Sequence, residues 1–547
     1  MLNCFITSNA FTFFYFLRKK GIHKAKLSDL NSMTNAQYIE LEQELVDKNF
    51  IQDPVANLIA SPTNGWRTGP ITEAQEWMFK AKRNPALIPQ RDAALKELAS
   101  RSNHDQLRDY LLQTAVQQQY NLSFAGGKTN SSYYISGNYT KDRPVFKSNE
   151  AEKYSVLSNL TNNFLNNRLV VTTGLNYNYS KSQVNTAAIS ALSEGSLGLA
   201  PYELLVNANG NRIRKGVVFT TRTSDSLTRV RNLLPWTYNA IDELQYGNTI
   251  NTGNVVRINS SVKGIITKWL NFTVSGQIQK SFEEQVNLKN ENSYYTRNLI
   301  NTGTSQQNVA LFGTVYGFPK GGIYQAGRIN RNDYGLRGQF DVNKDFGTDH
   351  HFDMIAGAEI REEKASGSEQ MLYSYNEELS TSINVNTVGN AARYYTIYGN
   401  QISIGQPNNL ISRYIRRYLS YYGNASYSYL GKYHATASAR FDDFNIVGVS
   451  RRARATPLWS AGLRWDIFKE DFMSDIQWVS GLSLRSSIGV SGNVPEQSPN
   501  FTTIRLGLVD GYTQLPYANI GFPVNQDLGW EITKMTNVGL DVALFNN

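Results

Sequence analysis

Few side chains in this sequence have the types and spacing that catalysis or nucleotide binding requires. Gly126-Gly127-Lys128-Thr129 contains the last letters of a phosphate-binding loop, but the residue five positions before Gly127 is Leu122, so we interpret the segment as a hairpin turn. His350-His351 lies in a short polar turn without a matching Glu or third ligand, which disfavours a metal site.

His434 is the remaining candidate for chemistry. It lies on the polar face of a predicted strand, and a solvated histidine is favoured over a general base because no Ser and carboxylate can be placed beside it. No Gly-x-Ser-x-Gly elbow occurs either. The sequence therefore predicts a protein that is not an enzyme and needs no metal or cofactor.

Aromatic side chains in the long segments between predicted strands are the candidate ligand-binding or partner-binding residues. Such side chains could stack on a sugar, a peptide or an aromatic ligand, or pack the loops on one another, and packing is favoured for any single one. The candidates are Trp236, Tyr238, Tyr294, Tyr295, Tyr373, Tyr375, Tyr394, Tyr395 and Tyr398.

The elements that must position these loops are strands, and the clearest lie between Leu419 and Asp466. Apolar and polar residues alternate there with a period of two over about ten residues, which is longer than the strands of most soluble sheets. One face is aromatic at its ends and small in the middle, while the other carries Arg and Asp. This pattern predicts a lipid-facing wall with aromatic girdles and a wet interior, the wall of a bacterial outer-membrane barrel. The apolar face comprises Leu419, Tyr421, Ala425, Tyr427, Tyr429, Ala435, Ala437, Ala439, Phe441, Trp459, Ala461, Leu463 and Trp465.

Composition agrees with this interpretation. The mean hydropathy of −0.41 and the absence of a central run of about twenty apolar residues exclude a helical membrane protein, whereas a barrel hides its hydrophobicity by alternation. The single cysteine, Cys4, cannot form an intramolecular disulfide. The net charge of +9 is spread among strands and loops rather than gathered on one helix, so we predict no nucleic-acid partner.

Three regions follow one another along the chain. Residues 1–26 form an atypical N-terminal segment that makes a poor signal peptide, because positive charge follows its apolar stretch. Residues 27–118 are predicted to be a helical excursion, with Thr34 capping its first helix. Residues 119–547 are predicted to be barrel strands. Short turns alternate with long segments at 183–251, 282–333 and 362–414, which is the periplasmic and extracellular asymmetry of outer-membrane barrels.

Several segments resemble the SusC/RagA class of TonB-linked outer-membrane proteins. The resemblance covers roughly residues 27–547. Its most specific parts are the Leu-Gly-Trp-Glu segment near the end and the Trp-Ser-x-Gly-x-x-Trp strand. The segments are MTNAQYIELEQ (33–43), QQQYNLSFAGGKTNSSYYISGNYT (117–140), APYELLVNANGN (200–211), RATPLWSAGLRWDIFKEDFM (454–473), LRSSIGVSGN (484–493) and LGWEITKMTNVGLDVALFNN (528–547).

The resemblance implies an antiparallel transmembrane β-barrel of the 22-stranded type with an internal plug. Such a protein imports oligosaccharide or peptide fragments with energy from TonB, in partnership with a SusD-like surface lipoprotein. No plug or TonB box precedes Leu27, so we expect this chain to be a fragment that forms an incomplete barrel and reaches TonB only through N-terminal parts it lacks. A passive porin or structural barrel, and a soluble carbohydrate-binding β-protein, are the alternatives.

Overall fold

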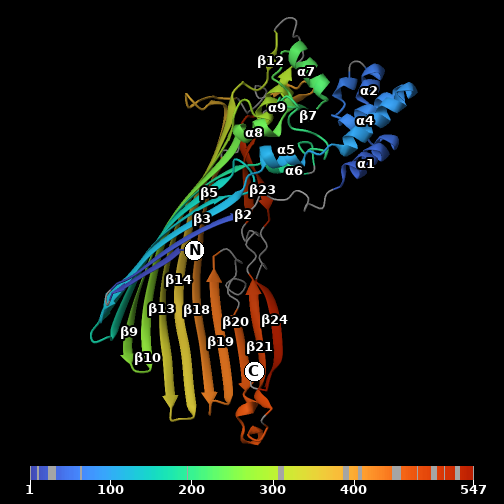
Figure 1. Cartoon of the computed structure of the whole chain (residues 1–547). Coiled ribbons are helices and arrows are strands. Elements are labelled where there is room, and N and C mark those ends of the chain that lie inside the picture. The colour runs from blue at the N-terminus through green and yellow to red at the C-terminus, as the bar shows by residue number, and fades with distance from the viewer. Residues whose placement is uncertain are drawn as a thin grey trace.

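One antiparallel sheet organises the computed structural model (Figure 1). Its strands follow the order β1-β2-β3-β4-β5-β6-β9-β10-β13-β14-β18-β19-β20-β21-β24. Each strand of the sheet therefore pairs with the strands of the same sheet that precede and follow it in the chain. The structure describes residues 2–8, 11–22, 33–61, 64–193, 195–305, 313–385, 393–403, 410–445, 457–476, 478–493, 502–510, 512–523 and 530–545. The predicted fold class, an all-β partial barrel wall with a short helical excursion near the N-terminus, is confirmed.

The strands of this wall are longer than the sequence pattern predicted. They are β1 (Leu2–Ser8), β2 (Phe11–Ile22), β3 (Ala115–Lys128), β4 (Ser131–Arg143), β5 (Glu150–Phe164), β6 (Leu169–Asn185), β9 (Gly247–Thr267), β10 (Leu270–Lys289), β13 (Gly322–Phe346), β14 (His350–Asn376), β18 (Ile411–Tyr429), β19 (Tyr433–Phe444), β20 (Pro457–Trp465), β21 (Val479–Asn493) and β24 (Glu531–Leu544). Because β13 and β14 have 25 and 27 residues, they continue well beyond an apolar band that needs about ten.

Smaller elements lie in the connections. The strands are β7 (Lys215–Gly216), β8 (Thr237–Tyr238), β11 (Thr304–Ser305), β12 (Val315–Tyr316), β15 (Thr381–Ile383), β16 (Arg393–Tyr395), β17 (Gln401–Ser403), β22 (Thr503–Val509) and β23 (Pro516–Phe522). The helices are α1 (Asn35–Asp47), α2 (Pro54–Ala60), η2 (Gly65–Arg67), α3 (Glu73–Arg83), η3 (Pro85–Leu87), α4 (Ile88–Ser100), α5 (His104–Gln106), η4 (Leu107–Leu111), α6 (Ala187–Leu192), α7 (Thr221–Val230), α8 (Ala240–Tyr246), α9 (Tyr294–Thr302), η6 (Ile467–Lys469) and η7 (Asp471–Met473). Within the described ranges, no helix has the length and apolarity to cross a membrane.

The two ends of the wall differ as predicted. Tight turns join the strands at one end, where Asn166 and Leu430 adopt left-handed backbone φ angles of 52° and 52°. The helices α1 to α9 lie at the opposite end (Figure 1). We define the cap as the described residues within 186–246, 290–321 and 377–410, and the helical excursion as those within 33–114.

The register of the sheet keeps one face apolar from strand to strand. Ala437 pairs with Ala425 on β18 and with Ala461 on β20, and the next strand continues the row with Ile488. Large side chains on this face remain open, as with Leu463, which is 67% exposed. The predicted face assignment is consistent with a wall whose outer side meets lipid.

Two aromatic girdles border this apolar face. On the cap side, the ring centroids of Tyr120, Tyr139, Tyr154 and Tyr179 follow one another at 6.0, 4.7 and 5.9 Å. On the turn side, Tyr429, Tyr433 and Trp465 stack at 6.2 and 6.4 Å. Along β5, ten residues separate Tyr154 from Phe164 near the turn, which is about 25 Å after strand tilt and matches an apolar band.

The helical excursion begins as predicted. Thr34 caps α1 in a capping box with Gln37, and Thr72 caps α3 in the same way with Gln75. Helix α2 lies in the same predicted region, with Asp53 as its N-cap and Pro54 in its first turn.

The N-terminal segment differs from expectation, since no strand was predicted there. β1 pairs with β2, and β2 pairs with β3 so that Tyr15 lies opposite Leu122. The apolar and aromatic stretch interpreted as a poor leader therefore extends the sheet. β3 also begins at Ala115, four residues before the predicted start at Gln119.

Candidate functional site

The inner face of the wall contains a polar pocket across β6, β9, β10, β13 and β14. Its volume is about 420 Å³. Because side chains alternate along each strand, it is lined from the face opposite the aromatic girdles. Its charged and amide side chains are Asn259, Gln277, Asp333, Arg337, Glu359 and Arg361.

A chain of hydrogen bonds fixes one side of this pocket. The Arg257 guanidinium donates to Gln279 Oε1 at 2.7 Å, and the Gln279 amide donates to Asp333 Oδ2 at 3.0 Å. The other Asp333 oxygen, Oδ1, is buried and has no partner among the described residues. Asp333 therefore retains an acceptor that a ligand or water could use.

The other side of the pocket carries two arginines. Arg361 lies over the ring of Tyr418, with its Cζ 4.2 Å from the ring centroid. Arg337 lies opposite Glu359 in the register of β13 and β14, and neither it nor Arg361 makes an ion pair within the described part of the chain. Two guanidinium groups and two carboxylates thus line the pocket, which can hydrogen-bond polar ligands of either charge.

The cap buries several of the predicted aromatic residues. Trp236, Tyr238, Tyr294 and Tyr373 are 1%, 4%, 8% and 9% exposed. Trp236 packs edge-on against Phe219, and its indole N–H donates to Asn298 Oδ1 at 2.9 Å. These four rings are packed inside the cap and the adjoining end of β14, which is the packing alternative for these positions.

The other candidates are more accessible. Tyr375, Tyr394 and Tyr398 are half-buried, while Tyr295 and Tyr395 are 47% and 39% exposed. Tyr295 receives the Lys289 ammonium at 3.4 Å from its ring centroid, and burial lowers the pKa of Lys289. Tyr295 and Tyr395 are the most exposed rings of the predicted set, and ligand contact stays a prediction for them.

The helical excursion is joined to the cap by stacked rings. Trp66 lies parallel to Tyr398 at 6.2 Å, and Arg67 lies over both rings at 5.4 and 5.5 Å. Arg67 Nη2 also donates to the Tyr398 carbonyl at 2.8 Å. The excursion is therefore packed on the cap rather than free in solvent.

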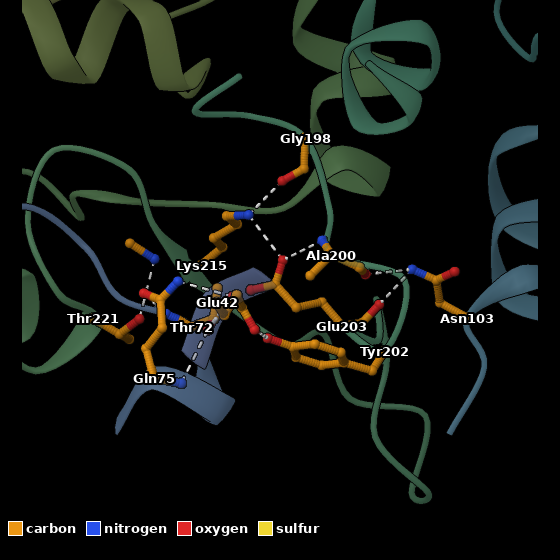
Figure 2. Close-up of polar contacts among 11 residues, drawn as sticks. Glu42, Thr72, Gln75, Asn103, Gly198, Ala200, Tyr202, Glu203, Lys215 and Thr221 are labelled. Carbon is orange, nitrogen blue, oxygen red and sulfur yellow. Dashed lines mark hydrogen bonds and ion pairs between the residues drawn. The ribbon is translucent and has the colours of Figure 1, made fainter. Parts of the chain in front are cut away.

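A second junction centres on the carboxylate of Glu42 in α1 (Figure 2). Glu42 is 2% exposed and accepts three hydrogen bonds: from Tyr202 Oη at 2.6 Å, Thr72 Oγ1 at 2.7 Å and Gln75 Nε2 at 2.9 Å. Burial raises its pKa to about 7, although the three donors act in the opposite direction. The two segments 33–43 and 200–211, both used for the family resemblance, meet at this contact.

Neighbouring contacts extend the junction. The Asn103 side-chain amide donates to the carbonyls of Ala200 and Glu203 at 2.9 and 3.0 Å, and Lys215 Nζ lies 2.9 Å from Glu203 Oε2. Gln106 Oε1 accepts from the backbone N–H groups of residues 205 and 206. The excursion thus holds loop 198–215 through buried polar groups that sequence patterns did not identify.

The glycine-rich motif and the histidines considered in the sequence lie in or beside strands and turns of the sheet. Gly127 and Lys128 are the last two residues of β3, beside the tight turn to β4, as the hairpin interpretation predicted. His351 contacts Asp345 and Asp353 at 2.6 and 2.7 Å. His434 Nε2 lies 3.2 Å from Asp466 Oδ2, so the prediction that no carboxylate lies beside His434 is wrong: the pairing of β19 with β20 brings the end of β20 to this histidine. No group of three or more metal-ligating side chains occurs in the ranges that the structure describes.

Comparison with known proteins identifies the family. The family described as "TonB dependent receptor-like, beta-barrel" matches residues 209–547. The chain belongs to this family. Its SusC/RagA type is supported by relatives: TonB-dependent receptor P3 of Formosa agariphila is 24% identical over 439 residues, covering 78% of this chain and 38% of the relative. TonB-dependent receptor SusC of Bacteroides thetaiotaomicron is 23% identical over 452 residues, covering 80% and 40%.

Solved structures show the same fold. The RagAB peptide importer in the open-open state aligns with a TM-score of 0.66 at 16% identity, covering 100% of this chain and 53% of that one. The RagAB peptide transporter aligns with a TM-score of 0.65 at 15% identity, covering 98% and 53%. The chain therefore spans about two-fifths of the relatives' length and about half of these structures.

Proposed function

We propose that this chain forms the wall and cap of a TonB-dependent importer in the bacterial outer membrane. The observation that carries the proposal is the two-sided sheet, which has aromatic girdles on its outer face and a charged pocket on its inner face. The chain also belongs to the TonB-dependent receptor-like β-barrel family. A wall of this kind separates lipid from a wet passage. Energy for import would come through TonB.

The proposed substrates are oligosaccharides or peptides. The pocket supports this proposal because Arg337, Arg361 and the free acceptor of Asp333 suit ligands rich in hydroxyl, amide or carboxylate groups. Exposed Tyr295 and Tyr395 in the cap suit stacking on a sugar or side chain.

The proposed partner is a SusD-like surface lipoprotein. The RagAB alignments and the SusC relative support a lipoprotein-partnered system, and the cap is the surface that such a partner would meet. Segments 183–251 and 282–333 supply much of that surface. Cross-linking in intact cells from these two segments should capture a lipoprotein; capture of none would contradict this partnership.

Uptake by cells tests the transport proposal. Labelled oligosaccharides and peptides are supplied to cells that carry the protein, with and without functional TonB. We expect uptake that stops without TonB, whereas TonB-independent uptake would favour the passive porin.

The inner pocket is tested in the same assay. Replacing Arg337 and Arg361 by Gln should lower uptake by about tenfold, because each loses a charge-assisted contact. Arg485→Gln is the matched control, since Arg485 lies on the inner face but pairs with Asp541 at 3.3 Å, outside the pocket. Equal uptake by the double variant and the control would show that the pocket does not contact substrate.

A further inference from the structure

The outer face of the wall carries an apolar groove directly behind the inner pocket. Its volume is about 630 Å³. Its walls are large apolar side chains that are 41–53% exposed: Ile258, Ile278, Tyr334, Leu336 and Ile360.

Small residues form the floor of this groove. Gly276 and Ser260 are neighbours in the register of β9 and β10, and they lie between the bulky side chains of the groove. A Cβ added to Gly276 would meet only the Gly335 carbonyl oxygen, at 4.0 Å. The groove therefore exists because glycine leaves this position empty, and a larger side chain could fill it without a backbone clash.

Cations border the groove on the cap side. Glu362 follows Ile360 along β14, and its carboxylate lies between two cationic side chains. Lys364 Nζ is 2.6 Å from one carboxylate oxygen and Arg417 Nε is 2.6 Å from the other. The Arg417 side chain is 64% exposed and uses Nε for this contact, and its two terminal nitrogens have no hydrogen-bond partner within the described ranges. Two cations share one carboxylate, so this border carries a net positive charge.

Lys280 adds a third cation on the same face. It lies opposite Asn332 on β13, and Asn332 lies opposite Lys364 on β14, so two strand spacings of about 10 Å separate the two lysines. Lys280 is exposed and makes no ion pair within the described ranges. It extends the positive border across the top of the groove.

We propose that this groove binds a phosphorylated glycolipid of the lipid A class from the outer leaflet. One acyl chain lies over Gly276 and Ser260, and the phosphate groups of the lipid contact the positive border at Arg417 and at Lys280. A guanidinium can hold a phosphate through two parallel hydrogen bonds, and basic groups beside an apolar surface are the pattern of anionic-lipid recognition. The inference rests on the proposed membrane location, which places the cap side outward, but not on the transport activity.

Native mass spectrometry of the protein in nanodiscs tests this site. The protein is extracted from its outer membrane and placed in phosphatidylcholine nanodiscs that contain either purified lipid A or phosphatidylglycerol, and the lipids that it retains are counted. We expect one retained lipid A and weaker retention of phosphatidylglycerol. Equal retention of the two would overturn the glycolipid assignment.

Variants distinguish the headgroup from the chain contacts. Arg417→Gln and Lys280→Gln should each weaken lipid A retention about fivefold, and Gly276→Leu about tenfold because it fills the groove. Gly423→Leu is the matched control on the outer face of β18, where an added Cβ meets only the Ile355 carbonyl oxygen at 3.7 Å. Heat-modifiable mobility verifies that each variant folds. Retention by the three groove variants equal to that of Gly423→Leu would overturn the proposal, and substrate uptake measured in parallel reports separately on the transport function.

Discussion

The wall and the cap are stabilised in different ways. The three clusters of buried apolar side chains within the described ranges lie in the cap, the helical excursion and the strand ends beside them. The wall instead has large apolar side chains exposed along one face and polar side chains along the other. The cap is thus an aqueous structure with its own core, whereas the wall needs lipid to cover its outer face.

This difference predicts where substitutions are costly. In the cap, stability depends on the volume of the buried side chains and on their hydrogen bonds, as in a soluble domain. In the wall, the backbone ladder is satisfied by neighbouring strands, and the side chain's face decides whether it meets lipid or water. Changes of volume should therefore disturb the cap most, and changes of charge should disturb the outer face of the wall most.

The largest expected effect is the loss of Trp236 from the cap core. Trp236→Ala should lower the free energy of opening the cap by about 3–5 kcal/mol, because a fully buried ring and its contact with Phe219 are removed. Hydrogen exchange of the amides in α8 and α9 measures this change. Tyr395→Ala is the control in the same cap and should stay within about 0.5 kcal/mol. Similar effects of the two substitutions would contradict a packed cap core.

The next prediction compares the cost of an arginine on the outer face of the wall with its cost on the inner face. Ala437→Arg should cost about 2–4 kcal/mol in lipid, because its row of alanines lies near the centre of the apolar band. Ser438→Arg should cost much less, since Ser438 points to the inner face and its Oγ lies 2.6 Å from Ser460 Oγ. Refolding of the purified protein into lipid vesicles measures both costs. Equal costs would show that the face assignment is wrong.

A pH dependence is expected at the junction of α1 with loop 198–215. The pKa of Glu42 is raised from 4.5 to about 7, so the folded junction holds a proton that the open state releases. Stability is therefore highest below pH 4.5, falls by up to about 3 kcal/mol as the pH rises to about 7, and is level above that. Hydrogen exchange of α1 amides, corrected for intrinsic rates, measures this slope.

Two variants test the assignment of that slope to Glu42. Glu42→Gln should abolish the pH dependence, whereas Glu44→Gln should keep it, because Glu44 is an exposed residue on the same helix that pairs with Lys48. A slope that persists in Glu42→Gln would assign the dependence to another group.

The sequence allowed most of the wall to be predicted, because a period of two is a strong local signal that lipid reinforces on one face. Residues 119–547 were expected to form barrel strands, and the main path of the described sheet runs through this region in chain order from β3 to β24. The outer ends of β13 and β14 were missed because they leave the membrane and lose the apolar alternation. The β1–β2 pair was missed because its apolar stretch resembled a leader segment.

The sites were less predictable because they depend on contacts between distant segments. Arg337 and Arg361 come together with Asn259 only through the strand order, and Glu42 meets Tyr202 across 160 residues. The aromatics of the cap could be identified by type, but whether a ring is buried like Trp236 or exposed like Tyr295 depends on tertiary packing.

Cysteine scanning along β14 tests most directly whether this sheet is a membrane wall. In a Cys4→Ser background, single cysteines replace residues 354–361 of the protein in its outer membrane, and a charged maleimide reports water access. We predict labelling at the odd-numbered positions, which include Glu359 and Arg361 of the inner pocket, and protection at the even-numbered positions, which include Ala356 and Ile360. Labelling without a period of two, or stronger labelling at the even-numbered positions, would contradict the account.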